Sequence, residues 1–375
     1  MSSYQWTGLV FALVGVITSA VLAVEGTRRK TLNLDHLPIS SILILVSRLM
    51  VGVLFVYSGF VKANDYLGFA YKLEEYFYVF GEHFPPLKGF FHLFIPAAGG
   101  LAWFISVFEI ALAFAILLGW RMPLTAWLSL LMMVFFTVLT GYSHFTGAVT
   151  DCGCFGDALP LKPWESFVKD LILMTMFIPL FLVRKSVRAF PSDRIAGILT
   201  GLSFLVAGFY SWYCHEHLPR IDYRAYKVGV DLNICTTEIG PEGYPPCKDW
   251  YPDFSPEEFP MGEPGLFEGH TLLIITNDVS EAPAEAARKS ADLAGKLENS
   301  HVKVIGATSS GDDALQAYRT TYGVKYPFCF MDETVLKTVV RSHPGYVLLA
   351  EGVIVKKWHH NDTPSYEEIM QLSGQ

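Results

Sequence analysis

Six long apolar runs fill the first 214 residues and restrict what the chain can fold into. They cover about residues 6–24, 39–61, 95–119, 122–141, 165–183 and 195–214. A helix needs roughly 20 apolar residues to cross the hydrocarbon core of a bilayer, and each run approaches that length. The mean hydropathy of +0.34 and the charged fraction of 17% are too apolar for an ordinary soluble protein. The sequence therefore predicts an all-α, polytopic membrane bundle with about six transmembrane helices.

The composition changes after residue 214. Residues 1–214 contain 14 Lys and Arg against 12 Asp and Glu, whereas the remainder contains 14 against 24. Such an acidic region without a basic run argues against nucleic acid as a partner. Its apolar runs predict a β-α-β-α-β-β-α order, with strands at 272–276, 302–307, 346–350 and 353–358 and helices at 281–297, 312–322 and 365–372. A small α/β domain follows from this pattern.

These observations divide the chain into five parts. We expect an N-terminal transmembrane helix with a basic cytoplasmic loop (1–38), a bundle (39–190), a sixth transmembrane helix (191–214), an irregular linker rich in Pro, Gly and Tyr (215–268) and an α/β domain (269–375).

Basic residues between the apolar runs predict the orientation of the bundle. They lie in three loops that share one side if the runs alternate: Arg28, Arg29 and Lys30; Arg121; Arg184, Lys185 and Arg188. Because cytoplasmic loops are enriched in Lys and Arg, that side is expected to be the cytoplasm. The opposite side then carries the loop 62–94, the loop near residue 152 and the C-terminal domain. Aromatic residues at helical spacing within 66–80 predict a helix there, lying in the interface or over the mouth of the bundle.

A pair of cysteines, Cys152 and Cys154, stands in a short polar loop on the outer side. Gly153 lets the backbone turn tightly enough for the two sulfurs to meet, and a strained disulfide is a better oxidant than a relaxed one. A reversible redox pair and a permanent staple of the loop both remain open. Two thiols without a nearby histidine fall short of the four ligands of a zinc site, so we expect no metal.

Several charged residues accompany this loop. Lys62, at the end of the second run, is a candidate to lower a thiol pKa or to hold an anion, and its alternative is an interfacial side chain. Asp157 is a candidate helix cap, turn former or proton carrier. Arg48 and Glu109 lie near the middle of their runs, and because lone charges are costly there, we expect them to pair inside the membrane. That pair fits a proton or quinone site or a structural ion pair.

The remaining cysteines have simpler interpretations. Cys235 and Cys247, eleven residues apart in the linker, are candidates for a structural disulfide in an oxidising compartment. Cys214 is a candidate partner for the cysteine loop. Cys329 alternates with aromatic residues and is expected to be buried.

The membrane region resembles the DoxX/MauE group of redox-associated membrane proteins, especially its long Bacteroidetes-type forms. The resemblance covers about residues 40–190, and it rests on Ser58-Gly59-Phe60-Val61-Lys62, Gly68 to Phe77, Glu109, Cys152-Gly153-Cys154-Phe155-Gly156-Asp157 and Pro163 to Asp170. It implies a link to periplasmic thiol oxidation or to sulfur oxidation coupled to quinone, in a bacterial inner membrane. A quinone is the one cofactor that it suggests.

The C-terminal domain resembles a thioredoxin-type fold over about 269–375. Pro344, in Ser342-His343-Pro344-Gly345 before a predicted strand, stands where that fold carries its cis-proline. The domain departs from the family pattern because Asn277-Asp278-Val279-Ser280-Glu281 replaces the CxxC that should open the first helix. Without a thiolate there, the domain is expected to bind a partner and not to exchange dithiols.

Two functions follow as expectations. The first is thiol–disulfide or quinone-linked redox chemistry in the periplasm, with Cys152 or Cys154 as the attacking thiolate. The alternative is a non-catalytic membrane subunit whose C-terminal domain binds another protein of the cell envelope. Both place a multi-pass protein in the lipid of the inner membrane, with its C-terminal domain outside.

Overall fold

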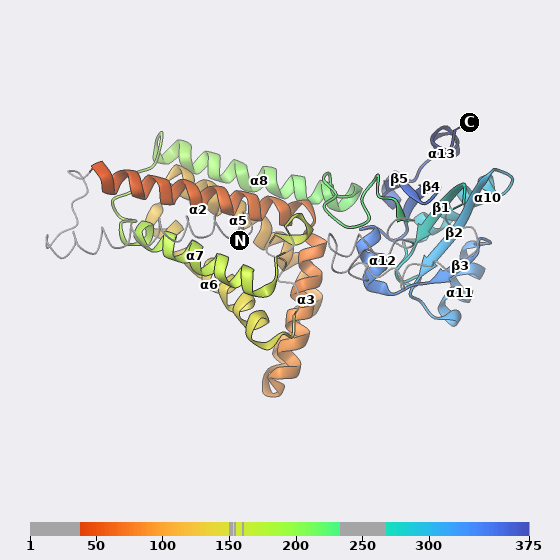
Figure 1. Ribbon diagram of the computed structural model, residues 1–375, viewed down its shortest axis with the longest axis horizontal. Coiled ribbons are helices and arrows are strands. Elements are labelled where there is room, and N and C mark those ends of the chain that lie inside the picture. Colours follow the sequence, from red (N-terminus) through yellow and green to blue (C-terminus); the bar gives the residue numbers. More distant parts are fainter. Residues whose placement is uncertain (1–37, 150–152, 154, 160, 233–267, 375) are drawn as a thin grey trace, which may run out of the picture. The chain divides into compact units, whose positions relative to one another are not determined.

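The computed structural model describes residues 38–149, 153, 155–159, 161–232 and 268–374. The chain divides into two compact units, Met1–Trp212 and Tyr213–Gln375. The first unit is helical, and the second is built around a β-sheet (Figure 1). The predicted transmembrane run 6–24 and the basic loop at 28–30 lie outside the described residues.

Seven α-helices begin within the described part of the helical unit. They are α2 (Pro38–Asn64), α3 (Tyr66–His83), α4 (Lys88–Phe94), α5 (Ala98–Leu118), α6 (Met122–Thr146), α7 (Pro163–Leu182) and α8 (Asp193–His217). Three 3₁₀ turns connect them: η2 (Pro85–Leu87), η3 (Ile95–Ala97) and η4 (Gly156–Ala158).

Four stretches of these helices are long and apolar enough to cross a membrane. They are Leu43–Asn64, Pro85–Leu118, Met122–Thr146 and Asp193–His217. The predicted run 165–183 forms α7, but its three charged residues, Glu165, Lys169 and Asp170, make α7 too polar for this class. The described part of the chain thus supports a helical membrane protein with four candidate spans, and a total of six stays a prediction.

Two glycines bring α2 and α5 close together. A Cβ atom at Gly52 would lie 2.5 Å from the side chain of Leu117, and one at Gly59 would lie 2.7 Å from that of Ile110. Small residues at such contacts let helix backbones approach closely in a membrane bundle. A shared apolar core joins α2 and α5 to α6 and α7, and it includes Val51, Phe55, Ile116, Met133, Phe177 and Leu180.

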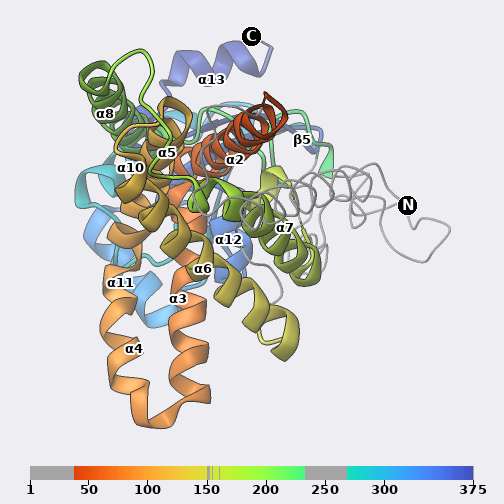
Figure 2. The ribbon, with the colours of Figure 1, turned by 90° about the vertical axis from the view of Figure 1, so that its left-hand side faces the viewer.

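The helix expected at 66–80 is α3, and α4 folds back beside it. Figure 1 shows α3 running across the direction of α2 and α8, and Figure 2 shows α3 and α4 side by side. Phe69, Leu73 and Tyr76 are buried on the bundle side of α3. Phe69 and Leu73 pack against residues of α5 and α6, including Ala102 and Phe136. The aromatic face of α3 therefore covers the bundle.

The C-terminal unit contains a mixed five-stranded sheet in the order β3-β2-β1-β4-β5. The strands are β1 (His270–Ile275), β2 (Val302–Thr308), β3 (Phe328–Phe330), β4 (Gly345–Ala350) and β5 (Val353–Trp358). β1 pairs in parallel with β2 and antiparallel with β4. The helices are α10 (Ala284–Leu297), α11 (Asp312–Tyr322), α12 (Glu333–Val339) and α13 (Tyr366–Leu372).

The observed order contains one strand and one helix more than the sequence predicts. β3 and α12 lie between α11 and β4, and β3 pairs in parallel with β2. A strand of three residues is too short to produce a periodic pattern, which explains why it was not predicted. Cys329 in β3 is buried, as predicted, and its thiol donates to the carbonyl oxygen of Gly306 at 3.3 Å. The thioredoxin-type fold itself stays a prediction.

The first part of the predicted linker 215–268 is built into the C-terminal unit. Gly229 N donates to Ile354 O at 2.7 Å, and Asp231 forms an antiparallel bridge with Val353. Tyr226 and Leu232 belong to the core under the sheet. The boundary at 269 is therefore too late, because the chain pairs with the edge strand β5 from residue 229 onward. The rest of the linker, 233–267, lies outside the described residues.

A buried charge cluster holds this added segment in place. Asp222 accepts from Arg224 Nε at 2.8 Å and pairs with Lys357 Nζ at 2.5 Å. The side chains of Arg224 and Lys357 are 3% and 4% exposed. Burial raises the pKa of Asp222, but the charges of Arg224 and Lys357 outweigh it and lower the pKa to about 2. The carboxylate is thus ionised at pH values above about 2.

Asp222→Asn should destabilise the C-terminal unit by about 3–5 kcal/mol, because it removes the negative partner that the structure shows for the buried Arg224 and Lys357. Burial already lowers the pKa of Lys357 to about 7. Either calorimetry of the purified full chain or its urea unfolding, monitored by protease sensitivity, measures this loss. Asp292→Asn is the matched control, since its partner Lys296 is exposed, and it should leave the transition unchanged.

The same cluster predicts a dependence of stability on pH. The folded pKa of Asp222 lies below its ordinary value of 3.8, so its stabilising contribution is complete above about pH 4. It is lost as the pH falls through 2. The difference in unfolding free energy between the natural protein and Asp222→Asn should therefore shrink between pH 4 and pH 2. A difference that stays constant over this range would contradict the assignment.

Candidate functional site

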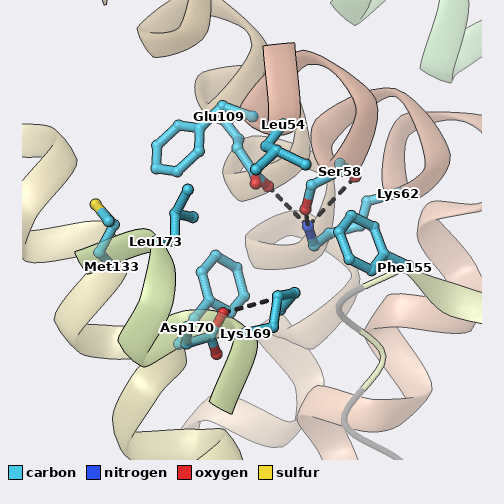
Figure 3. Close-up of a pocket in the computed structure, with 11 residues that line it drawn as sticks. Leu54, Ser58, Lys62, Glu109, Met133, Phe155, Lys169, Asp170 and Leu173 are labelled. Carbon is cyan, nitrogen blue, oxygen red and sulfur yellow. Dashed lines mark hydrogen bonds and ion pairs between the residues drawn. The ribbon is translucent and has the colours of Figure 1, made fainter. Parts of the chain in front are cut away.

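A small cavity with charged residues in a mainly apolar lining lies among α2, α5, α6 and α7 (Figure 3). Its volume is about 30 Å³, which is room for one or two water molecules. Its polar lining consists of Ser58, Lys62, Glu109, Lys169 and Asp170. Two lysines and two carboxylates thus meet within an otherwise apolar bundle.

The first ion pair joins Lys62 of α2 to Glu109 of α5. The Lys62 ammonium lies 2.8 Å from Glu109 Oε2, and the two side chains are 1% and 4% exposed. The ammonium also donates to Ser58 Oγ at 2.5 Å and lies 4.9 Å from the centre of the Phe136 ring. Lys62 therefore points into the bundle, and the interpretation as an interfacial side chain is wrong.

The second ion pair lies within α7. Lys169 Nζ is 2.8 Å from Asp170 Oδ1, and Thr140 of α6 donates to Asp170 Oδ2 at 2.9 Å. Lys169 also lies over the ring of Phe155, 4.6 Å from its centre. Asp170 is buried, and Lys169 is 24% exposed. The second ion pair thus joins a partly exposed ammonium group, that of Lys169, to a buried carboxylate, that of Asp170.

The loop after α6 reaches this cavity through Phe155. Phe155 is buried, lines the cavity and packs against Tyr57 with ring centres 5.5 Å apart. Gly153 is also buried and has a φ of +64°. A Cβ atom at Gly153 would lie 3.2 Å from Lys72 Cγ of α3. Only glycine combines this backbone conformation with so close an approach.

The predicted dithiol residues themselves lie outside the described residues. Cys152 and Cys154 belong to this group, as do Cys235 and Cys247, and their roles stay predictions. The structure describes the immediate neighbours Gly153 and Phe155. Cys214, also weighed as a redox partner, is buried.

The predicted pair of Arg48 and Glu109 is wrong. Arg48 instead donates to the carbonyl oxygens of Ile116 and Leu117, at 2.7 and 2.6 Å, and so caps the C-terminal end of α5. Cations are favourable at this negative end of the helix dipole. The prediction assumed that the second and third runs end at one level, whereas α2 begins about ten residues beyond the level of the α5 terminus.

Asp157 has a different role from a helix cap. It is exposed and lies in the turn η4, as the prediction of turn formation requires. The N-terminal cap of α7 is Lys162, whose backbone N–H donates to the side chain of Glu165 at 3.0 Å. Asp157 therefore does not cap α7, and a role as proton carrier stays a prediction.

In the C-terminal unit, the peptide bond between His343 and Pro344 is cis, as the sequence predicts. At the end of β1, Ser280 N and Ser280 Oγ donate to Asp278 Oδ1 at 2.8 and 2.6 Å. These hydrogen bonds lower the pKa of Asp278. The turn after β1 therefore presents a carboxylate.

Sequence reasoning missed three residues of the site. Ser58 stands four residues before Lys62, a spacing that places both side chains on one face of a helix and could have indicated their contact. Thr140 and Phe136 gave no such signal, because a single hydroxyl or ring in an apolar run is ordinary. Their roles depend on how α6 packs against α2 and α7.

One comparison with known proteins gives a match. Residues 40–183 match the family model described as methylamine utilisation protein MauE. No curated protein and no solved structure matches this chain. The matched segment includes all but the first two residues of α2, the whole of α3 to α7, and all five polar residues of the cavity. The similarity is therefore to the helical unit, as the resemblance seen in the sequence implies.

Lys62→Met should destabilise the helical unit by about 3–5 kcal/mol, because Glu109 loses its buried partner. Lys62→Met combined with Glu109→Gln should recover part of this loss, since no unpaired charge remains. Heating in detergent followed by size-exclusion chromatography measures the midpoint of each variant.

Lys88→Met provides the matched control, because the pair of Lys88 and Glu82 is exposed. It should leave the midpoint unchanged. If Lys62→Met and Lys88→Met lower the midpoint equally, the buried pair stabilises the bundle no more than an exposed pair does.

Proposed function

We propose that the helical unit carries out thiol–disulfide exchange through Cys152 and Cys154 at the outer surface of a membrane. The observation that supports this most is the placement of Gly153 and Phe155, one against α3 and one in the cavity. Cys152 and Cys154 are the sequence neighbours of these two residues.

The charges around the loop suit a reactive thiol. A nearby cation favours the thiolate, which is the attacking species in disulfide exchange. Lys169, which pairs with Asp170, contacts Phe155. Lys72, which pairs with Glu75, lies beside Gly153. Both lysines are partly exposed, whereas the side chain of Lys62 is 1% exposed and pairs with the buried Glu109. We therefore assign Lys62 the positioning of the bundle beneath the loop and not the direct contact expected from the sequence.

The proposed exchange is balanced in atoms and electrons. A thiolate of the client attacks one sulfur of the Cys152–Cys154 disulfide, and the other cysteine leaves as a thiolate that takes up a proton. The second client thiol then attacks the mixed disulfide, so the client becomes a disulfide and both cysteines become thiols. In the reverse direction, Cys152 or Cys154 is the attacking thiolate.

A quinone does not fit the cavity, whose 30 Å³ holds little more than water. No step of this proposal therefore passes through a quinone. The experiment below tests the quinone suggested by the family resemblance by adding it to the reduced Cys152–Cys154 pair.

The basic loops support the proposed orientation of the bundle. Phe190 N donates to Leu118 O at 2.9 Å, which brings the loop after α7 to the end of α5. Arg121 and Arg188 thus belong to one end of the bundle, and Gly153 and Phe155 belong to the other. By the positive-inside tendency, the cysteine loop faces the periplasm of a bacterial inner membrane.

A second function belongs to the C-terminal unit. The strand order β2-β1-β4-β5 and the helices α10 and α11 suit a thioredoxin-like domain. Asp278 occupies the turn where such a domain carries its thiols, and Cys329 is buried. This unit would therefore bind another cell-envelope protein. If Cys152 and Cys154 are only a staple, the whole chain is such a non-catalytic subunit.

Redox titration of the Cys152–Cys154 pair in purified membranes tests the proposal. An exchange pair should have a midpoint between about −120 and −270 mV, whereas structural disulfides lie below about −300 mV. Cys152→Ser should abolish oxidation of a dithiol peptide by the membranes. Cys329→Ser is the matched control and should retain this activity.

Two outcomes would overturn the proposal. The first is a midpoint below about −300 mV together with unchanged peptide oxidation in Cys152→Ser. The second is failure of a membrane-impermeant alkylating reagent to label Cys152 from the periplasmic side after reduction. Added quinone that reoxidises the pair would extend the mechanism to a second step.

A further inference from the structure

The hairpin of α3 and α4 has one face on the bundle and another that no described residue of the helical unit covers. Rings join the two helices, with Phe77 5.7 Å from Phe94 and Phe80 5.4 Å from Phe91. The outer side of the turn and of α4 carries Phe84, Leu87, Phe90 and Leu93, which are 48%, 50%, 57% and 69% exposed.

The length of the apolar stretch places this surface at the edge of the bilayer. Pro85–Leu118 contains 34 residues. The helix α5 alone has 21 residues and is about 31 Å long, which already matches the hydrocarbon core of about 30 Å. The residues before Ala98 must then lie beyond the core, at the interface.

The direction of the hairpin agrees with this placement. The candidate spans α2 and α8 run along the bundle, and α3 runs across them with α4 at its side (Figures 1 and 2). A helix that lies across membrane-spanning helices, at their end, lies along the membrane surface. Amphipathic helices bury their apolar face in such an interface.

We propose that α4 and the preceding turn are inserted into the outer lipid interface through Leu87, Phe90 and Leu93. Phe104 on α5 is likewise apolar and exposed. Lipid is favoured as the occupant because α4 and α5 belong to one stretch, Pro85–Leu118, that is long and apolar enough to cross a membrane. The hairpin contains Lys72 and Lys88 against Glu74, Glu75 and Glu82, so apolar burial and not anionic headgroups supports the contact.

The contact has a consequence for the neighbouring loop. The same hairpin presents Phe69 and Lys72 to Gly153. Lipid insertion of α4 therefore holds α3, and with it the backbone of the loop at Gly153, at the level of the interface. This inference does not depend on the redox state of the cysteines.

Site-specific photocrosslinking in vesicles of zwitterionic lipid tests the inference. Benzoylphenylalanine is placed at position 90 or 93 of the full chain, and mass spectrometry detects adducts. Position 88 is the matched control, because at 100° per residue Lys88 lies on the opposite side of α4 from Phe90. Position 138 is the positive control, since Val138 is 60% exposed on the candidate span α6.

Lipid adducts at positions 90 and 93 that are at least as abundant as at 138, with few at 88, are expected. Crosslinked dimers at position 90 would show that a second copy of the chain, and not lipid, covers this face of α4, and would overturn the inference. Equal lipid adducts at positions 88 and 90 would contradict the proposal that the Phe90 side of α4 faces the lipid. An absence of lipid adducts at 90 and 93, with adducts present at 138, would overturn the inference.

Discussion

The buried pair of Lys62 and Glu109 is the interaction on which the helical unit depends. An isolated charge is costly inside an apolar bundle, whereas a pair with good geometry offsets much of that cost. The ammonium has its carboxylate at 2.8 Å, the hydroxyl of Ser58 at 2.5 Å and a ring face beside it. These contacts fix the rotation of α2 relative to α5, and the glycines of α2 then set their separation.

The apolar runs were sufficient to predict the helices of the bundle, but not the partners of its charges. Run length predicts α2, α5, α6 and α8 because hydrophobic length is a property of one segment. The partner of Glu109 depends on the axial stagger of α2 against α5, which the sequence pattern does not encode. A shift of about ten residues places Arg48 at the end of α5 and Lys62 opposite Glu109.

In the C-terminal unit, the long strands and helices were predictable and the short elements were not. β1, β2, β4 and β5 have six or seven residues each, most of them apolar. β3 has three residues, and the segment at Gly229–Leu232 bonds to β5 through its backbone. Backbone pairing leaves no mark on side-chain pattern, so a segment that looked like a linker is part of the sheet unit.

The position of the cavity bears on the chemistry of the adjoining loop. Phe155 closes one wall, and Lys169 lies on its ring above the buried Asp170. Asp170 is bonded to Lys169 and to Thr140, so its side chain is held in one position against α6. The ion pairs therefore fix the helices on which the loop rests. Thiol exchange needs no further catalytic group at this cavity, because the thiolate itself is the nucleophile and a thiolate is the leaving group.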